Sequence, residues 1–276
     1  MTNASHTQSG FADVNGAKLY YEVAGAGHPL VLLHAGVADN TLWDDQFDLF
    51  AQSYRVVRYD QRGFGQSEMP PGPFAFYKDL AGLLDFLGIE KAHVCGVSMG
   101  GRTVIDFALA YPDRVAALIP VAAGLSGTPP DESAKPLYAP LEEAYEAQDL
   151  DRVLDLESDL WLVGPRRTRD AVSPALHEHF RKMERHNLER EFSGPEEGTP
   201  ENLDPPAYDR LGEIHAPTLV IIGDADLPNT IATAARLAAN IVGARKVVLP
   251  DTAHLVPMER PTEFNRIVLD FLPNVV

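Results

Sequence analysis

Residues 92–101 read Ala-His-Val-Cys-Gly-Val-Ser-Met-Gly-Gly, and this stretch decides the fold. The first six residues form an apolar run that predicts a buried strand, and a helical pattern begins at Gly101. Ser98 lies at the junction, between Gly96 and Gly100, in the Gly-x-Ser-x-Gly arrangement of a nucleophile elbow. Such a turn exposes the serine hydroxyl, and the small flanking residues let the strand and the helix approach closely. We therefore predict that Ser98 is a nucleophile.

Similar short apolar runs recur along the chain, and helical patterns lie between them. They occupy residues 30–34, 54–59, 92–97, 117–122, 218–222 and 246–249. Apolar runs without alternation suit strands that are buried on both faces of a parallel sheet. Because these strands alternate with helical stretches such as 76–87 and 102–111, they predict a doubly wound, mostly parallel α/β fold. Near the N-terminus, Asn15-Gly16 between two strand-like runs predicts an additional β-hairpin.

Residues 131–213 interrupt this rhythm and contain no strand-like run. The segment is rich in proline at both ends and helical within, and residues 173–174 (Ser-Pro) have the form of a helix start. It carries 21 acidic and 10 basic residues. We predict that it is a helical cap (lid) inserted into a core formed by residues 1–130 and 214–276. Its acidic run, 142–159, is expected to be a solvated helix face.

Composition and charge restrict the possible partners. The 276 residues include 40 acidic and 23 basic side chains, so the formal charge of −17 argues against binding to nucleic acid or to an anionic membrane. No apolar run approaches the length of a membrane span, and residues 1–10 read as a frayed polar tail, not a secretory signal. The single cysteine, Cys95, cannot form an internal disulfide. Together these features favour a cytoplasmic protein.

A nucleophilic serine needs a base, and the base needs a group that orients it. His254 and Asp226 each follow the end of an expected strand, and loops gather at the carboxyl edge of a parallel sheet. The chain order Ser98, Asp226, His254 is the order of such triads in sheets of this kind. We predict that these three residues are catalytic. Asp224, two residues before Asp226, is an alternative orienting acid.

With these motifs in place, the chain resembles the α/β-hydrolase fold family, in its group of esterases, 3-oxoadipate enol-lactonase-like enzymes and cofactor-free haloperoxidases. The resemblance extends along nearly the whole chain. It rests on the elbow and on four further pieces: His34-Ala35-Gly36, Trp43, residues 60–67 (Asp-Gln-Arg-Gly-Phe-Gly-Gln-Ser), and Ala253-His254 with Glu259-Arg260-Pro261.

The resemblance implies an oxyanion hole made of two backbone N–H groups. One belongs to Met99, which also heads a helix whose dipole favours developing negative charge. The other comes from the loop after the first buried strand, at Gly36 or at its neighbour Val37. Both remain open because Ala35 stands where the family usually has glycine. The resemblance also implies that no cofactor is needed.

Other conspicuous residues receive simpler interpretations. In the family, the equivalents of Asp60 and Arg62 tie neighbouring loops together, and Cys95 is expected to be a small core residue. Val37, Trp161 and Phe180 are candidates for lining the substrate pocket, with core packing as the alternative for Trp161 and Phe180. No metal site is expected, because positions i and i+2 do not share a helix face and the insertion spaces its histidines poorly for ligation: His177, His179, His186.

These observations favour a serine hydrolase that cleaves a small carboxylic ester or lactone through an acyl-enzyme. Carbon–carbon bond hydrolysis, amide cleavage and perhydrolase or haloperoxidase-type chemistry use the same triad. Haloalkane dehalogenases and epoxide hydrolases are disfavoured, because they use an aspartate nucleophile. A small-molecule receptor on the same fold is an alternative of a different class. The expected partner is a small-molecule substrate, selected by the helical cap, and the expected protein is a monomer or homodimer.

Overall fold

The computed structural model describes residues 7–194 and 198–275, so the first six residues of the expected tail lie outside it. Eight strands form one sheet in the order β1-β2-β4-β3-β6-β7-β9-β10. The first two strands are antiparallel to their neighbours, and the others run parallel. Their bounds are β1 (Gln8–Val14), β2 (Ala17–Ala24), β3 (Pro29–Leu33), β4 (Arg55–Tyr59), β6 (Ala92–Val97), β7 (Val115–Val121), β9 (Leu219–Gly223) and β10 (Arg245–Leu249). Each strand of the parallel part begins and ends within two residues of its expected position.

The expected hairpin is present at the N-terminal edge of the sheet. Asn15 and Gly16 join β1 to β2 with φ angles of 47° and 81°, the left-handed conformation that this sequence pair tolerates. β1 already starts at Gln8 and pairs in register with β2. The prediction of a tail through residue 10 is therefore wrong for its last three residues, which pair with β2 as a strand.

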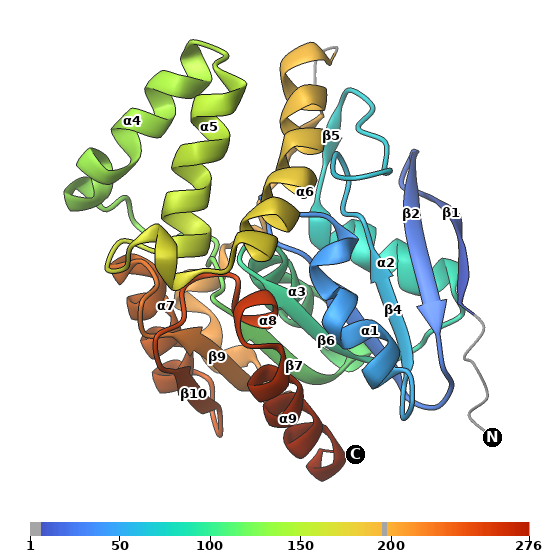
Figure 1. Ribbon diagram of the computed structural model, residues 1–276. Helices are drawn as coiled ribbons and strands as arrows, with labels where there is room; N and C mark the ends of the chain where they lie inside the picture. The colour runs from blue at the N-terminus through green and yellow to red at the C-terminus, as the bar shows by residue number, and fades with distance from the viewer. Residues whose placement is uncertain (1–6, 195–197, 276) are drawn as a thin grey trace.

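Alternate side chains of the buried strands supply two hydrophobic cores, one on each face of the sheet. In β3, Val31 and Leu33 belong to one core and Leu30 and Leu32 to the other. The first face is covered by α2 (Phe76–Phe86), α3 (Met99–Ala110) and α7 (Pro228–Asn240). The second face is covered by α1 (Asp44–Phe50), α8 (Val256–Glu259) and α9 (Pro261–Phe271) (Figure 1). This three-layer arrangement leaves the carboxyl edge of the sheet for the loops.

Three longer helices of the inserted segment stand together above that edge (Figure 1). They are α4 (Lys135–Glu146), α5 (Leu150–Glu157), which continues as a π-helical turn η4 (Ser158–Val163), and α6 (Pro174–Ser193). The Ser173 side chain caps α6 by accepting from the Leu176 N–H. The first two helices and α6 enclose a small core of their own, formed by Ala144, Val153, Leu154 and Leu188.

The inserted segment contains a short strand that was not expected from the sequence. A two-residue strand, β8 (Thr199–Pro200), pairs in parallel with β5 (Pro73–Phe74) of the core, so the segment does contain extended structure. So short a pairing leaves no apolar run in the sequence.

The remaining connections contain short 3-10 turns: η1 (Asn40–Trp43), η2 (Pro112–Arg114), η3 (Glu132–Ala134), η5 (Arg169–Ala171), η6 (Ala207–Asp209), η7 (Leu211–Glu213) and η8 (Leu272–Asn274).

The acidic run 142–159 is not solvated throughout. Glu157 is buried beside Glu184 of α6, and the two residues are 4% and 3% exposed. The Tyr145 hydroxyl donates to Glu157 at 2.9 Å. Burial raises the pKa of Glu157 to about 7 and raises that of Glu184 well above its usual range. The prediction of a solvated face is therefore wrong at Glu157.

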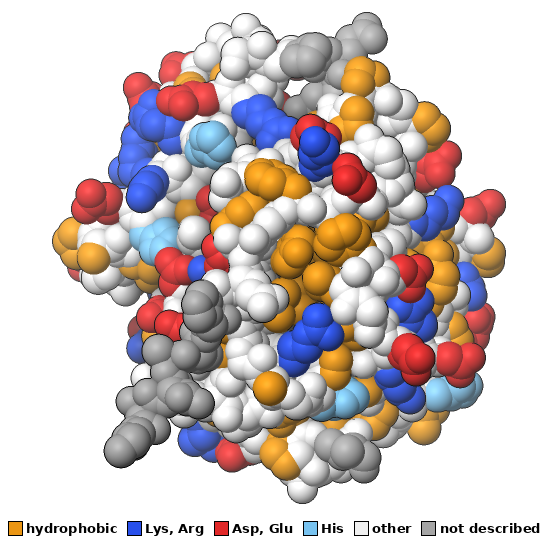
Figure 2. Space-filling view, turned by 90° about the vertical axis from the view of Figure 1, so that its right-hand side faces the viewer, with side chains coloured by type: hydrophobic (Ala, Val, Ile, Leu, Met, Phe, Trp, Pro, Cys, Tyr) orange, Lys and Arg blue, Asp and Glu red, His pale blue; other side chains and the backbone are white. Residues whose placement is uncertain are grey.

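The molecular surface carries few large exposed apolar side chains. Figure 2 views the side of the molecule on which β1, β2 and α2 lie, and hydrophobic side chains gather near the middle of that side. The exposed aromatics of these elements are Phe11 of β1 and Phe86 of α2, each about half exposed. In the part of the chain that the structure describes, no helix is long and apolar enough to cross a membrane.

A pair of histidines, His93 buried and His28 partly exposed, lies at the opposite end of the sheet from the loops that follow the parallel strands. His93 of β6 is fully buried, and its ring lies 4.3 Å from that of His28, centroid to centroid. Within residues 7–194 and 198–275, neither ring nitrogen of His93 has a hydrogen-bond partner. Burial and, to a smaller extent, the neighbouring His28 together lower the pKa of His93 to about 4. His93 is therefore held neutral in the folded protein.

We expect His93→Leu to make the fold less sensitive to acid. Between pH 6.5 and about 4 the unfolded chain takes up a proton at His93 that the folded chain refuses, so stability falls as the pH falls through this window. Leucine removes this penalty at similar volume. Urea unfolding at both ends of the window should show a smaller loss of unfolding free energy for H93L than for the natural protein. The exposed His215→Leu is the control, and equal losses in all three proteins would contradict the expectation.

Candidate active site

Ser98 occupies a strained turn between β6 and α3. Its φ and ψ are 54° and −110°, values that a residue with a side chain adopts only when its surroundings enforce them. A Cβ on Gly96 would lie 2.2 Å from the carbonyl oxygen of Gly100. A Cβ on Gly100 would lie 2.6 Å from the carbonyl oxygens of both His34 and Leu33. The two glycines thus permit the close crossing of β6, α3 and β3 that carries Ser98.

The two other expected residues meet at the same edge of the sheet. Asp226 follows β9 and His254 follows β10, and both are almost completely buried. His254 Nδ1 lies 3.0 and 2.9 Å from the two carboxylate oxygens of Asp226. The Leu227 N–H also donates to this carboxylate, at 2.6 Å. Asp224, the alternative acid, is exposed and accepts from the Asp251 N–H, so the acid that contacts the histidine is Asp226.

This pairing fixes the protonation of the imidazole. An ionised carboxylate only accepts hydrogen bonds, so the bond to Asp226 assigns the proton of neutral His254 to Nδ1. Nε2 then carries a free lone pair. It is buried and has no hydrogen-bond partner in the described part of the chain. A buried imidazole nitrogen in this state is able to take a proton from a hydroxyl group.

Two loops meet beside Ser98 at the head of α3. A Cβ on Gly36 would lie 3.7 Å from both Cβ and Sδ of Met99, so the loop after β3 lies against the first residue of the helix. This loop is fixed by the fully buried His34, whose Nδ1 lies 2.7 Å from the Ala35 carbonyl oxygen. Its Nε2 accepts from the Gln61 N–H at 2.9 Å. Gly36 and Val37, the two candidates for the second oxyanion donor, are therefore carried by one rigid loop.

The loop at residues 60–67 supports its neighbours. Asp60 is almost fully buried and accepts from both the backbone and the side-chain amide of Asn40 and from the Gln66 N–H. Arg62 makes a two-pronged ion pair with Asp79, at 2.7 and 2.9 Å. These contacts fit the architectural role that the sequence resemblance implies.

Comparison with known proteins agrees with this geometry. The sequence profile of the alpha/beta hydrolase fold matches residues 28–261. A 2-hydroxy-6-oxononadienedioate/2-hydroxy-6-oxononatrienedioate hydrolase of Burkholderia vietnamiensis is 32% identical over 92% of this chain and 91% of its own length. The chain belongs to the alpha/beta hydrolase fold family.

Solved structures of similar proteins have the same architecture. The enol-lactonase from Burkholderia xenovorans LB400 superposes with a TM-score of 0.77 at 29% identity, covering 96% of this chain and all of that one. A thermophilic esterase from Thermogutta terrifontis superposes with a TM-score of 0.75 at 26% identity, covering 97% of this chain and 99% of that one. The superposition with each of these α/β-hydrolases therefore covers nearly all of the chain, including the inserted segment.

The inserted segment reaches the triad through η4. The Trp161 ring lies 4.8 Å from the His254 ring, centroid to centroid. The backbone carbonyl oxygen of Trp161 accepts from the backbone N–H of His254 at 3.3 Å. The ring of Tyr138 in α4 lies 6.3 Å from the Trp161 ring, centroid to centroid, and is tilted against it by 36°. Phe180 lies elsewhere, fully buried in the core under α6 with Met183, which is the packing alternative considered for it. Of the two expected pocket residues in the insertion, only Trp161 contacts the triad histidine.

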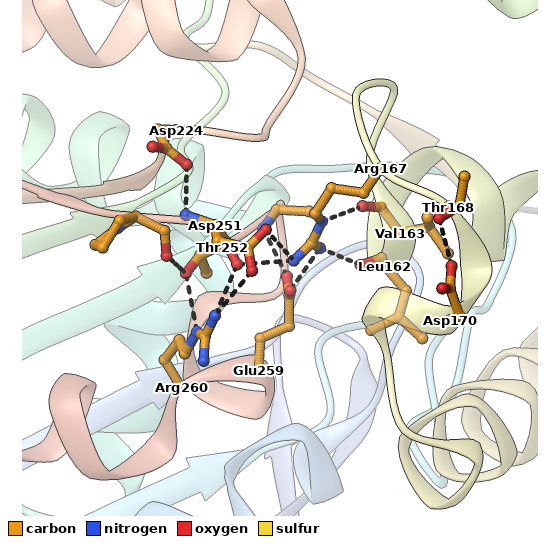
Figure 3. Close-up of polar contacts among 12 residues, drawn as sticks. Leu162, Val163, Arg167, Thr168, Asp170, Asp224, Asp251, Thr252, Glu259 and Arg260 are labelled. Atoms are coloured by element: carbon orange, nitrogen blue, oxygen red, sulfur yellow. Dashed lines mark hydrogen bonds and ion pairs between the residues drawn. The ribbon is translucent and has the colours of Figure 1, made fainter.

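An ion-pair cluster beside the loop that carries His254 was not expected from the sequence (Figure 3). Arg167 of the insertion pairs with Glu259 of α8 at 2.6 Å, and Glu259 accepts from the Ala253 N–H at 2.9 Å. Burial raises the pKa of Glu259 to about 7, although Arg167 opposes the shift. Glu259 stands in the sequence motif after the histidine, but the motif does not reveal its partner, because Arg167 lies 92 residues away.

Cys95, His177 and His186 have surroundings that differ from those of the triad. Burial raises the pKa of the Cys95 thiol well above its usual range, as befits a core residue. His177 lies 3.1 Å from the Ser158 hydroxyl and His186 lies 3.2 Å from the Gly65 carbonyl oxygen. Within the described ranges, no three His, Cys, Asp or Glu side chains converge as metal ligands.

A small cavity of about 140 Å³ opens beside the head of α3. Met99 and Arg102 line it on the helix side, and Phe76, Tyr77 and Asn202 line it on the other. Arg102 lies one turn after Ser98 and is already bound to Asn202 and, at 3.8 Å, to Asp106.

We expect Gly100→Ala to destabilise the fold of this α/β-hydrolase and Gly124→Ala to leave its stability nearly unchanged. The new methyl group at position 100 would collide with two backbone carbonyls, which cannot move without displacing β3 and the loop that follows it. At position 124 it would meet Arg102 Cβ at 3.6 Å and the Ser98 carbonyl oxygen at 3.7 Å, which is ordinary contact. Overpacking typically costs about 1–3 kcal/mol, so thermal unfolding should show a clear loss for G100A. Equal unfolding midpoints for the two variants would contradict the argument.

Proposed function

We propose that this chain is a serine hydrolase in which Ser98 is the nucleophile, His254 the base and Asp226 the orienting acid. The proposal rests on one observation above all. His254 is buried with Nδ1 bound to Asp226 and with Nε2 unpartnered within the described residues. The strained elbow at Ser98 supplies the hydroxyl group from which such a base takes a proton.

The reaction follows from these positions. His254 Nε2 takes the proton of Ser98 while the serine oxygen attacks the substrate carbonyl carbon. The resulting oxyanion is stabilised by the N–H of Met99 at the head of α3 and by a second N–H from Gly36 or Val37. The imidazolium returns its proton to the leaving group, which departs to give an acyl-enzyme. Water then attacks the acyl-enzyme with the help of the same base and regenerates Ser98.

A small carboxylic ester or lactone is the substrate that we favour. The enol-lactonase and the esterase that resemble this chain support this class. Charge supports it as well. The two arginines described near the site already have partners, since Arg102 is bound to Asp106 and Asn202 and Arg167 is paired with Glu259. A neutral ester or lactone leaves these pairs intact, whereas a dianionic substrate would compete for them.

Carbon–carbon bond hydrolysis is the second candidate. The observation that favours it is the relative from Burkholderia vietnamiensis, whose name states 2-hydroxy-6-oxononadienedioate and 2-hydroxy-6-oxononatrienedioate as its substrates. The same triad would serve, because the bond that breaks lies next to a ketone carbonyl. Arg102 is 40% exposed and would have to leave Asp106 to bind a substrate carboxylate.

The decisive experiment compares both substrate classes with the natural protein and Ser98→Ala. The panel contains p-nitrophenyl esters from acetate to long acyl chains, simple lactones, and 2-hydroxy-6-oxononatrienedioate. We expect rapid turnover of short esters or lactones that disappears in S98A. Faster cleavage of 2-hydroxy-6-oxononatrienedioate would instead favour the second candidate. Turnover that persists in S98A, or its absence with every substrate in a folded protein, would contradict the serine hydrolase itself.

Asp226→Asn should separate the orienting acid from its neighbour. An amide in this position stabilises the wrong tautomer of His254, and the corresponding change in a Ser-His-Asp enzyme lowers kcat by about 10⁴. Asp224→Asn keeps a side chain that accepts from Asp251 and is expected to retain kcat within about threefold. Steady-state kinetics on the best ester would check both. Similar losses in the two variants would argue against the assignment of Asp226.

A further inference from the structure

Residues 161–167 of the insertion, which we call the cap turn, touch both loops that carry the acid and the base. The cap turn consists of the end of η4 and the loop that follows it. One of its carbonyls, a glycine and a guanidinium group contact His254 or the chain beside Asp226 and His254.

The first contact is to the histidine itself. The carbonyl oxygen of Trp161 accepts the backbone N–H of His254 at 3.3 Å. The Trp161 ring lies 4.8 Å from the imidazole at an interplanar angle of 44°. The backbone and the ring of His254 are therefore both held by one residue of the insertion.

The second contact is a close approach of backbones at Gly164. A Cβ there would lie 2.5 Å from the Ala225 carbonyl oxygen and 2.9 Å from the Ala253 side chain. These two alanines immediately precede Asp226 and His254. Gly164 also has a φ of 81°, which disfavours any side chain at this position. The cap turn thus lies directly on both catalytic loops.

The third contact is the buried ion pair drawn in Figure 3. Arg167 and Glu259 are 8% and 5% exposed in their side chains. Arg167 uses its whole fork, because Nε donates to Val163, Nη2 to Leu162 and Glu259, and Nη1 to Asp251. Glu259 in turn accepts the N–H of Ala253. A guanidinium bound in this way fixes the distance between the cap turn and the loop of His254.

We propose that Arg167 and Glu259 are positioning residues that hold the His254 loop against the cap turn and thereby align the imidazole between Asp226 and Ser98. The inference rests on the proposed function, since it assigns a task to residues around the same triad. Neither residue touches the reacting atoms. Both act through the backbone at positions 251 and 253, so their loss is expected to tilt the imidazole without changing the pocket wall.

Physical considerations favour this task over simple stabilisation of the cap. A buried ion pair adds little net stability, because desolvation offsets most of its attraction. It does impose geometry, and misplacement of a catalytic group by about 1 Å costs on the order of 10²-fold in rate. The exposed ion pairs that join α5 to α6, such as Arg181 with Asp155, suffice to connect cap elements without reaching the triad.

The test uses Arg167→Met, Arg167→Lys and Glu259→Gln in the full chain. Arg169→Met is the matched control, because Arg169 pairs with Asp159 in the same part of the insertion and is half exposed. For R167M we expect kcat to fall about ten- to hundredfold with KM within about threefold. R167K should recover part of the loss, since it keeps the charge but not the fork. The losses of R167M and E259Q should not multiply when the changes are combined.

Two readouts distinguish alignment from cap stability. The rate at which a small fluorophosphonate modifies Ser98 should fall by the same factor as kcat, because this reaction needs the base but little of the pocket. The downfield proton NMR signal of the His254–Asp226 hydrogen bond, identified by its loss in D226N, should shift or broaden in R167M and stay unchanged in R169M. Thermal unfolding verifies that each variant is folded.

The outcomes separate this inference from the proposed function. An R167M protein that keeps kcat, phosphonylation rate and NMR signal overturns the positioning role, as does a loss that appears only in KM. If the natural protein shows no turnover and no modification of Ser98, the proposed function fails. The NMR comparison of R167M with R169M then still decides whether the cap turn aligns the pair of His254 and Asp226.

Discussion

The close crossing of β6, α3 and β3 beneath Ser98 is the constraint on which the rest of the site depends. Gly96 and Gly100 leave no room for a methyl group, since each would collide with backbone oxygens at 2.2 to 2.6 Å. This contact sets three things at once: the strained conformation of Ser98, the direction of the Met99 N–H, and the position of the loop after β3. Because backbone atoms of the buried sheet make the contact, this half of the site is as rigid as the core itself.

The half of the site that carries Asp226 and His254 has weaker support from the sheet. β10 is an edge strand, and four of its five residues are not buried. A loop that follows such a strand has neighbours on one side only. The insertion supplies the other side, through Trp161, Gly164 and Arg167. The triad therefore combines a serine fixed by the core with a base fixed in large part by the cap.

Much of this arrangement is visible in the sequence, because it depends on local chemistry. The elbow, the Asn15-Gly16 turn and the apolar strands are specified by neighbouring residues, and all were predicted close to their observed bounds. The β5–β8 pair and the buried Glu157 depend on contacts between distant segments, and neither residue type nor periodicity indicates them. The ion pair of Arg167 with Glu259 belongs to this second kind, since arginine in a polar loop usually indicates a solvated side chain.

The cap is tied to the core at several places. Besides the cap turn, Asn187 of α6 donates to the Ala38 carbonyl oxygen at 3.2 Å and accepts from the Gly65 N–H at 3.1 Å, beside the oxyanion loop. Opening the insertion as one body would break both sets of buried polar contacts, and each buried group left unpaired costs about 1–3 kcal/mol. Movement of α4 costs less, because only Ala144 of this helix is buried. Substrate entry is therefore expected to displace α4 while α6 and the cap turn stay in place. Sequence changes that alter selectivity are then tolerated best in α4, and least at the residues that align His254.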